Sequence, residues 1–139
     1  MREQTEYRMR LLYSLLACLA APLAFLVQLG RGFGDRAYWD RASERFGFGP
    51  KLPGPTLWVH AVSVGEVRAA AILVPRLMQR WPGLPIVITT TTPTGARQVR
   101  ALFADRVTHC YLPFDLPGAV RRFLDRAQPH AGIVMETEI

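Results

Sequence analysis

Hydroxyl and carboxylate side chains recur in short polar stretches of this sequence, each directly after an apolar run. Ser63, Gly65 and Glu66 follow the first such run, and a run of threonines that includes Thr91 and Thr92 follows the second. A carboxylate can take a proton from a substrate hydroxyl as that hydroxyl attacks, and neighbouring hydroxyl groups can bind the substrate by hydrogen bonds. These residue types predict a site for a polar substrate and general-base chemistry.

Glu66 is the sharpest candidate for the base. It falls in the first turn of a predicted helix, whose N-terminus favours an ionised carboxylate. The preceding Gly65 leaves room for backbone or substrate to approach closely. A glutamate at this position can also be a helix cap with structural value alone, and the local sequence leaves that alternative open.

A second acidic pair, Glu136 and Glu138, ends the sequence beyond its last apolar run. Alternate residues of a strand point to opposite faces, so one carboxylate could reach the substrate while the other pairs with an arginine. A salt-bridge role for both is the alternative.

Histidine and cysteine spacing predicts no metal centre. His60 lies inside a predicted strand, where a hydrogen-bonded core histidine is the expected state. His109 and His130 lack companions at the spacing of metal ligands, and the two cysteines form no CxxC pair. We therefore expect neither a zinc site nor a disulfide framework.

Strand and helix patterns alternate four times after Pro55. Predicted strands cover 57–61, 85–90, 107–112 and 131–135, and predicted helices cover 65–80, 92–104 and 115–127. We expect Thr92 to cap the second helix, with Pro93 in its first turn, and Asp115 to cap the third. This alternation is typical of an α/β fold with a Rossmann-like parallel sheet. Ligands bind beyond the carboxyl ends of such strands, where all the polar stretches above would meet.

An apolar segment precedes this domain. Residues 11–29 contain no charge, and their length suits a hydrocarbon core of about 30 Å. We predict a membrane anchor at 1–29, with a cleaved signal peptide and an interfacial or buried helix as alternatives. Arginines flank the segment on both sides, and their distribution leans toward a cytoplasmic domain.

Residues 30–56 are rich in glycine, proline and charge, and predict a juxtamembrane linker with a short helix near 36–46. Glycines 30, 32 and 34 follow no strand, so they do not indicate a phosphate loop. The remaining 57–139 form the α/β domain, which stops just after a strand and therefore looks incomplete.

The composition limits the class of partner. Half of the 139 residues are hydrophobic, which excludes a disordered chain, and the net charge of +6 comes almost wholly from arginine. Such a charge suits phosphates, acidic lipid head groups or nucleic acid, although a GC-rich genome gives the same bias. The chain has no basic-aromatic motif and carries an apolar anchor, so we expect no nucleic-acid partner.

Four motifs resemble a known family when read in order: WVHAVSVGEV at 58–67, ITTTTPTG at 88–95, YLPFD at 111–115 and METEI at 135–139. They are similar to the N-terminal half of 3-deoxy-D-manno-octulosonic acid (Kdo) transferases of lipopolysaccharide synthesis. The resemblance implies a GT-B glycosyltransferase, in which this half binds a lipid A precursor and a C-terminal domain binds the donor CMP-Kdo. It also implies inversion at the anomeric carbon, no bound metal or other cofactor, and a place at the cytoplasmic face of the inner membrane.

The resemblance assigns roles to the residues singled out above. Glu66 corresponds to the proposed catalytic base, and Glu136 or Glu138 would help to bind the acceptor. We expect Ser63, Gly65, Thr91 and Thr92 to complete the acceptor site.

Two alternatives remain. The sequence lacks the donor-binding domain, so an inactive, membrane-anchored acceptor-binding module or a truncated fragment is one. The other is a different glycosyltransferase or a nucleotide-binding Rossmann protein, and the absence of GxGxxG after the first strand disfavours a dinucleotide site.

Overall fold

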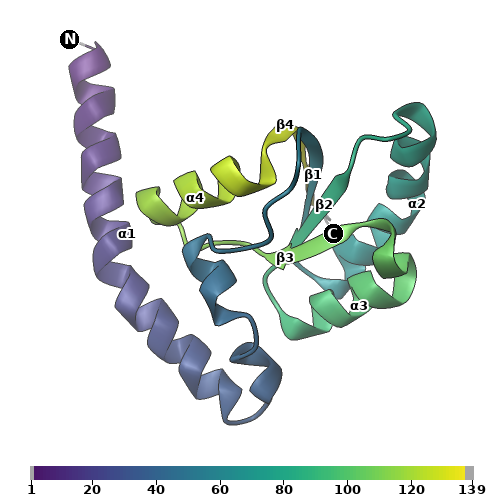
Figure 1. The fold of residues 1–139 in the computed structure, drawn as a ribbon. Helices are drawn as coiled ribbons and strands as arrows, with labels where there is room; N and C mark the ends of the chain where they lie inside the picture. Colours follow the sequence, from purple (N-terminus) through teal and green to yellow (C-terminus); the bar gives the residue numbers. More distant parts are fainter. Residues whose placement is uncertain (1, 137–139) are drawn as a thin grey trace.

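The computed structural model describes residues 2–136 of the chain and shows a sheet of four parallel strands (Figure 1). The strands are β1 (Thr56–Ala61), β2 (Ile86–Thr90), β3 (Thr108–Tyr111) and β4 (Pro129–Met135), in the spatial order β3-β2-β1-β4. All four predicted strands and the parallel α/β fold are confirmed. β4 begins two residues earlier than predicted, at Pro129, a residue that an edge strand accepts at its first position.

Helices cover both faces of the sheet. In Figure 1, α2 (Val64–Arg80) and α3 (Pro93–Phe103) lie on one face, and α4 (Pro117–Ala127) lies on the other. Alternate strand residues fill the two cores: Val59 and Ile88 pack beneath α2 and α3, whereas Val87 packs with Phe123 of α4. The pattern is the one expected for a doubly wound sheet.

α3 begins where the sequence predicted, whereas α4 does not. Thr92 caps α3 as predicted, and its hydroxyl accepts the N–H of Gly95 at 3.2 Å. The prediction that Asp115 caps α4 is wrong. Leu116 is the N-cap residue and makes no side-chain cap, because Pro117 opens the helix and keeps the preceding residue extended.

The region 30–56 is folded rather than a plain tether. It contains two 3₁₀ helices, η1 (Arg36–Tyr38) and η2 (Ala42–Phe46), where the sequence predicted one short helix. Glu44 and Arg45 are buried against the sheet domain. Gly47 ends η2 with a φ of +84°, and a Cβ there would collide with the carbonyl group of Ala119 in α4. These contacts fix the segment to the edge of the domain.

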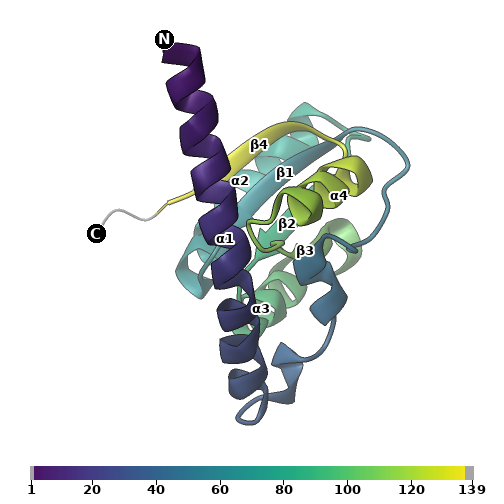
Figure 2. The same ribbon diagram turned by 90° about the vertical axis from the view of Figure 1, so that its left-hand side faces the viewer.

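α1 (Arg2–Gly32) is longer than the predicted apolar segment and runs alongside the domain (Figure 2). Its residues Leu11–Gly32 form a helix long and apolar enough to cross a membrane, and its most apolar stretch has no buried residue. The half-buried side chains recur every three or four residues, at Ser14, Ala17, Ala21 and Phe25. The Phe25 ring meets the Phe46 ring with centroids 5.6 Å apart, so a narrow stripe of α1 contacts the domain.

Candidate functional site

The predicted site residues gather at the carboxyl end of the sheet, where the strand order changes direction. The chain runs outward from β1 to β3 and then crosses to the opposite side of β1 for β4. Ala61 pairs with Met135 at the ends of these two strands, so Val62 and Glu136 leave the sheet side by side. In open α/β sheets this topological switch point is the usual ligand site.

Glu66 lies at the start of α2 and closes a capping box. The Ser63 hydroxyl accepts the Glu66 N–H at 3.3 Å, and the Glu66 carboxylate accepts the Val62 N–H at 2.5 Å and the Ser63 hydroxyl at 3.1 Å. These bonds satisfy donors that a helix N-terminus leaves free and fix the carboxylate in place. Glu66 remains half-exposed, and each carboxylate oxygen keeps acceptor capacity for a substrate hydroxyl.

Gly65 is exposed beside Glu66. A Cβ at this position would meet nothing nearer than the Ser63 hydroxyl at 3.7 Å, an ordinary contact. Packing in the described chain therefore does not require glycine here, and the binding role of Gly65 stays a prediction.

The threonine run contributes to the same end of the sheet. The Thr91 hydroxyl donates to the carbonyl of Val62 at 3.3 Å, which ties the loop after β2 to the loop after β1. The Thr92 hydroxyl is occupied by its cap and lies 3.0 Å from the Thr94 hydroxyl. The structure thus brings Thr91 next to the Glu66 loop and places Thr92 one step away, at the start of α3.

The acidic pair is described only in part. Glu136 is exposed directly after β4, at the switch point. Glu138 lies outside the described residues, so its role stays a prediction.

His60 lies beneath this end of the sheet and is buried, as the sequence predicted. Its Nδ1 is 2.8 Å from the Thr89 hydroxyl, which also accepts the indole N–H of Trp58 at 2.8 Å. Burial lowers the pKa of His60, although the nearby Glu66 carboxylate opposes that shift. At neutral pH the ring is a neutral support under Glu66.

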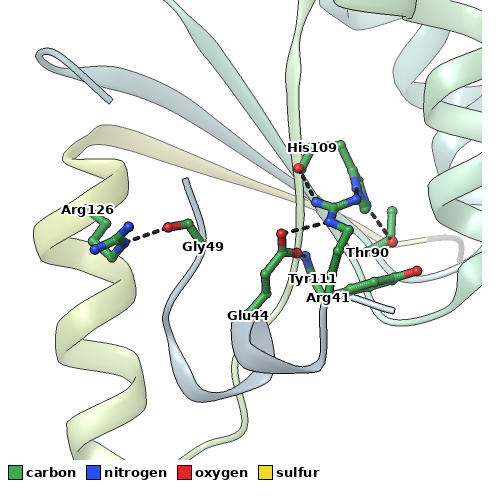
Figure 3. A network of polar contacts seen from close by, with 7 residues as sticks. All are labelled: Arg41, Glu44, Gly49, Thr90, His109, Tyr111 and Arg126. Carbon is green, nitrogen blue, oxygen red and sulfur yellow. Dashed lines mark hydrogen bonds and ion pairs between the residues drawn. The ribbon is translucent and has the colours of Figure 1, made fainter. Parts of the chain in front are cut away.

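A polar network that the sequence reasoning missed closes the other edge of the sheet (Figure 3). The Glu44 carboxylate accepts the Tyr111 N–H at 2.8 Å and the Arg41 Nε–H at 2.7 Å. Arg41 Nη2 donates to the carbonyl of His109 at 2.5 Å. The side chains of η2 therefore take the hydrogen bonds that a neighbouring strand would make with β3.

Arg45 joins this network to the candidate site. Its Nη2 donates to the carbonyl of Thr91 at 2.5 Å, and its guanidinium carbon lies 4.3 Å from the centroid of the Tyr111 ring. Burial lowers the pKa of Arg45, and Tyr111 and Glu44 oppose the shift. A chain of contacts thus runs from η2 through Thr91 and Val62 to Glu66.

His109 is the centre of the network. Burial and the charges of Arg41, Arg100 and Arg45 lower the pKa of His109 to about 3. Its Nδ1 lies 3.0 Å from Arg41 Nη1, which can only donate, so Nε2 carries the proton and donates to the Thr90 hydroxyl at 2.9 Å. The histidine is a neutral connector between η2 and the end of β2.

One sequence signal could have revealed this network. Arg41 and Glu44 are three residues apart in a short stretch flanked by glycines, a spacing that brings opposite charges together on a helical turn. The sequence does not show that the pair reaches β3, because the partners are distant along the chain.

Comparison with known proteins identifies the family. The family model for 3-deoxy-D-manno-octulosonic-acid transferase (kdotransferase) matches residues 40–139. A 3-deoxy-D-manno-octulosonic acid transferase of Haemophilus influenzae is 50% identical over 73% of the chain, and one of Bordetella pertussis is 42% identical over 86%. A probable mitochondrial 3-deoxy-D-manno-octulosonic acid transferase of Arabidopsis thaliana is 34% identical over 92%.

The matches cover between 25% and 30% of the length of these relatives. No solved structure gives a significant match. The family match takes in all four strands and the segment that carries Arg41 and Glu44, and the described parts of the four motifs lie in the last residues of those strands and in the turns that follow them. The chain therefore belongs to the Kdo transferase family, the glycosyltransferases of lipopolysaccharide biosynthesis, and represents its N-terminal domain.

Proposed function

We propose that this chain is the acceptor-binding part of an inverting enzyme that transfers Kdo from CMP-Kdo to a lipid A precursor. An acceptor hydroxyl attacks the anomeric carbon of Kdo, the bond from that carbon to the CMP phosphate oxygen breaks, and CMP leaves. The proton of the hydroxyl passes to the Glu66 carboxylate. A donor-binding domain, in the part of the relatives that the chain does not cover, would hold CMP-Kdo.

The observation that carries this proposal is the placement of Glu66. Its carboxylate is oriented by Ser63 and Val62 and half-exposed at the switch point of a doubly wound sheet. General-base catalysis needs a fixed carboxylate with free acceptor capacity toward the substrate. The acceptor would be bound by the other predicted site residues: Ser63, Gly65, Thr91, Thr92, Glu136 and Glu138.

The apolar helix α1 supports a membrane location. We infer that α1 anchors the protein at the inner membrane with the domain facing the cytoplasm, since an acceptor with lipid chains lies in a membrane. The arginines after α1 agree with a cytoplasmic domain under the positive-inside rule.

The test is Kdo transfer by the full reading frame that contains this chain. Glu66→Gln keeps a hydrogen-bond acceptor for the Val62 N–H but removes the base, and we expect the rate to fall by about 10²–10⁴-fold. Asp125→Asn, an exposed acid on α4, is the matched control and should retain activity. Full activity of Glu66→Gln would refute the assignment of the base. An inactive wild type of normal fold would instead favour an acceptor-binding module without catalysis.

A further inference from the structure

A cavity of about 420 Å³ lies along the outer edge of β3, away from the switch point. Its walls come from α3, from the turn before β3 and from the stretch 37–41. We call it the arginine pocket and define it by six of its charged or aromatic residues: Asp40, Arg41, Arg97, Arg100, Asp105 and Tyr111. The network of Figure 3 forms one wall of the pocket, through Arg41 and Tyr111.

Two arginines of the pocket have guanidinium N–H groups available to bind a ligand. Arg97 and Arg100 are three residues apart on α3 and are both exposed. Within the described part of the chain the guanidinium group of Arg100 makes no hydrogen bond or ion pair, and that of Arg97 makes only long contacts with Asp35, at 3.3 and 3.4 Å. An exposed pair of this kind contributes little energy, so Arg97 can exchange Asp35 for a better partner.

A third arginine is held rigidly beside them. Arg41 donates to Glu44 and to the carbonyl of His109 and contacts the ring of His109, which leaves two of its five N–H groups free. Burial lowers the pKa of the half-buried His109, and the charges of Arg41 and Arg100 lower it further. Burial raises the pKa of Tyr111, and the charges of Arg41 and Arg97 oppose that rise. Three guanidinium groups therefore line the same cavity, and their combined positive charge suits a phosphate group.

The same walls carry two carboxylates. Asp40 and Asp105 are exposed and make no side-chain hydrogen bond among residues 2–136. A ligand with only a phosphate would bring its charge toward these carboxylates without any compensation. A ligand with a phosphate and several hydroxyl groups would satisfy both kinds of side chain, since carboxylates accept hydrogen bonds from hydroxyl groups.

We propose that the arginine pocket binds a phosphorylated sugar, with its phosphate on Arg97 and Arg100 and its hydroxyl groups on Asp40 and Asp105. The proposal extends the proposed function: the pocket would hold a phosphorylated sugar of the acceptor glycolipid. Pro93, the first residue of α3, also lines the pocket, so it opens next to the threonine run. The link from Arg45 through Thr91 to Val62 would couple its occupancy to the Glu66 loop.

Direct binding tests the pocket without any catalysis. The chain in nonionic detergent would be titrated by calorimetry with N-acetylglucosamine 1-phosphate, inorganic phosphate and N-acetylglucosamine. We expect the sugar phosphate to bind at least about tenfold tighter than either part, as two sets of contacts add. Equal affinity for inorganic phosphate would overturn the sugar assignment, and absence of binding would overturn the pocket.

Matched variants locate the binding. Arg97→Gln with Arg100→Gln should weaken the sugar phosphate about tenfold or more, whereas Arg68→Gln with Arg76→Gln, two exposed arginines of α2, should leave it unchanged. Asp40→Asn with Asp105→Asn should remove the preference over inorganic phosphate. An equal loss of affinity in the Arg68→Gln and Arg76→Gln control would show that net charge alone attracts the sugar phosphate, and it would refute the site.

Activity of the full reading frame separates the source of the ligand. If the sugar belongs to the acceptor, the Arg97/Arg100 variant raises the KM for the acceptor and keeps kcat, whereas Glu66→Gln lowers kcat. If the pocket instead binds a free sugar phosphate, the Arg97/Arg100 variant loses binding in calorimetry but keeps the KM for the acceptor. Failure of the proposed function leaves the calorimetric result intact, so the two proposals are judged separately.

Discussion

At the scale of a single residue, Glu66 has an observed role as a helix cap and a proposed role as the base. The hydrogen bonds that make it a helix cap also fix its carboxylate against the loop after β1. The alternative of a structural glutamate and the proposal of a catalytic base are therefore compatible, since the cap supplies the preorganisation that a base needs.

Ser63→Ala tests the cap. Loss of the hydroxyl that accepts the Glu66 N–H should lower the free energy of unfolding by about 1 kcal/mol. Urea unfolding in nonionic detergent measures it, with the exposed Ser43→Ala as control. An unchanged urea midpoint would show that Val62 and Glu66 hold the start of α2 without Ser63.

His109 should give the fold a pH dependence. Its pKa of about 3 in the folded chain lies below the ordinary 6.5, so the unfolded chain binds a proton that the folded chain refuses. Stability contributed by the neutral ring is present above pH 6.5 and falls as the pH drops toward 3, by up to about 1.4 kcal/mol per pH unit. Urea midpoints between pH 7 and 4 should fall less steeply for His109→Gln than for the wild type. Parallel curves would contradict a neutral His109.

At the scale of elements, the covered edge of β3 depends on one buried carboxylate. Glu44 has a side chain that is 10% exposed and receives donors from both the strand and Arg41. Its removal leaves the Tyr111 N–H and a guanidinium without their acceptor, which is costly in a buried site.

We therefore expect Glu44→Ala to destabilise the chain by about 2–3 kcal/mol, the cost of losing a charged acceptor. The exposed Asp125→Ala is the control for loss of one negative charge and should change stability by less than about 0.5 kcal/mol. Urea unfolding compares the two, and equal effects would contradict the role of Glu44 at the edge.

The elements show how far the sequence could be read. Strand patterns and the Thr92–Pro93 helix start depend on neighbouring residues, and both were predictable. Because the carboxyl ends of parallel strands meet at one edge of a sheet, the sequence also predicted that Ser63, Glu66 and Thr91 lie close together.

Two features could not be predicted from neighbouring residues. Asp115 does not cap α4 because Pro117 sets the start of that helix. The Glu44 network was missed because its partners Tyr111 and His109 are remote from Glu44 in sequence.

At the scale of the whole molecule, α1 runs alongside the domain, and its first turns extend beyond the sheet (Figure 2). Tyr13 hydrogen-bonds to Asp115, and Arg121 and Asp125 line a shallow hollow between α1 and α4. Charged groups are costly in hydrocarbon, so α1 can cross a bilayer only if this half separates from α4. In the packed arrangement, α1 suits the membrane surface.

Membrane binding should depend on the exposed apolar face of α1. Leu16→Arg with Leu23→Arg should abolish co-flotation with vesicles of phosphatidylethanolamine and phosphatidylglycerol, since an arginine on the apolar face opposes its burial in hydrocarbon whether α1 crosses the bilayer or lies in its surface. Ile72→Arg, at a residue 69% exposed on α2, is the control and should still float. Retained flotation of the double variant would assign membrane binding to another surface.

The sheet has two unlike sides. Beside β3, the side chains of η2 occupy the backbone groups that a further strand would need, whereas in the described residues β4 pairs with β1 alone. A further strand from any polypeptide can therefore pair with this sheet only at its β4 edge. It would arrive beyond β4, beside Glu136, so whatever extends the sheet also lengthens the rim that carries the switch point.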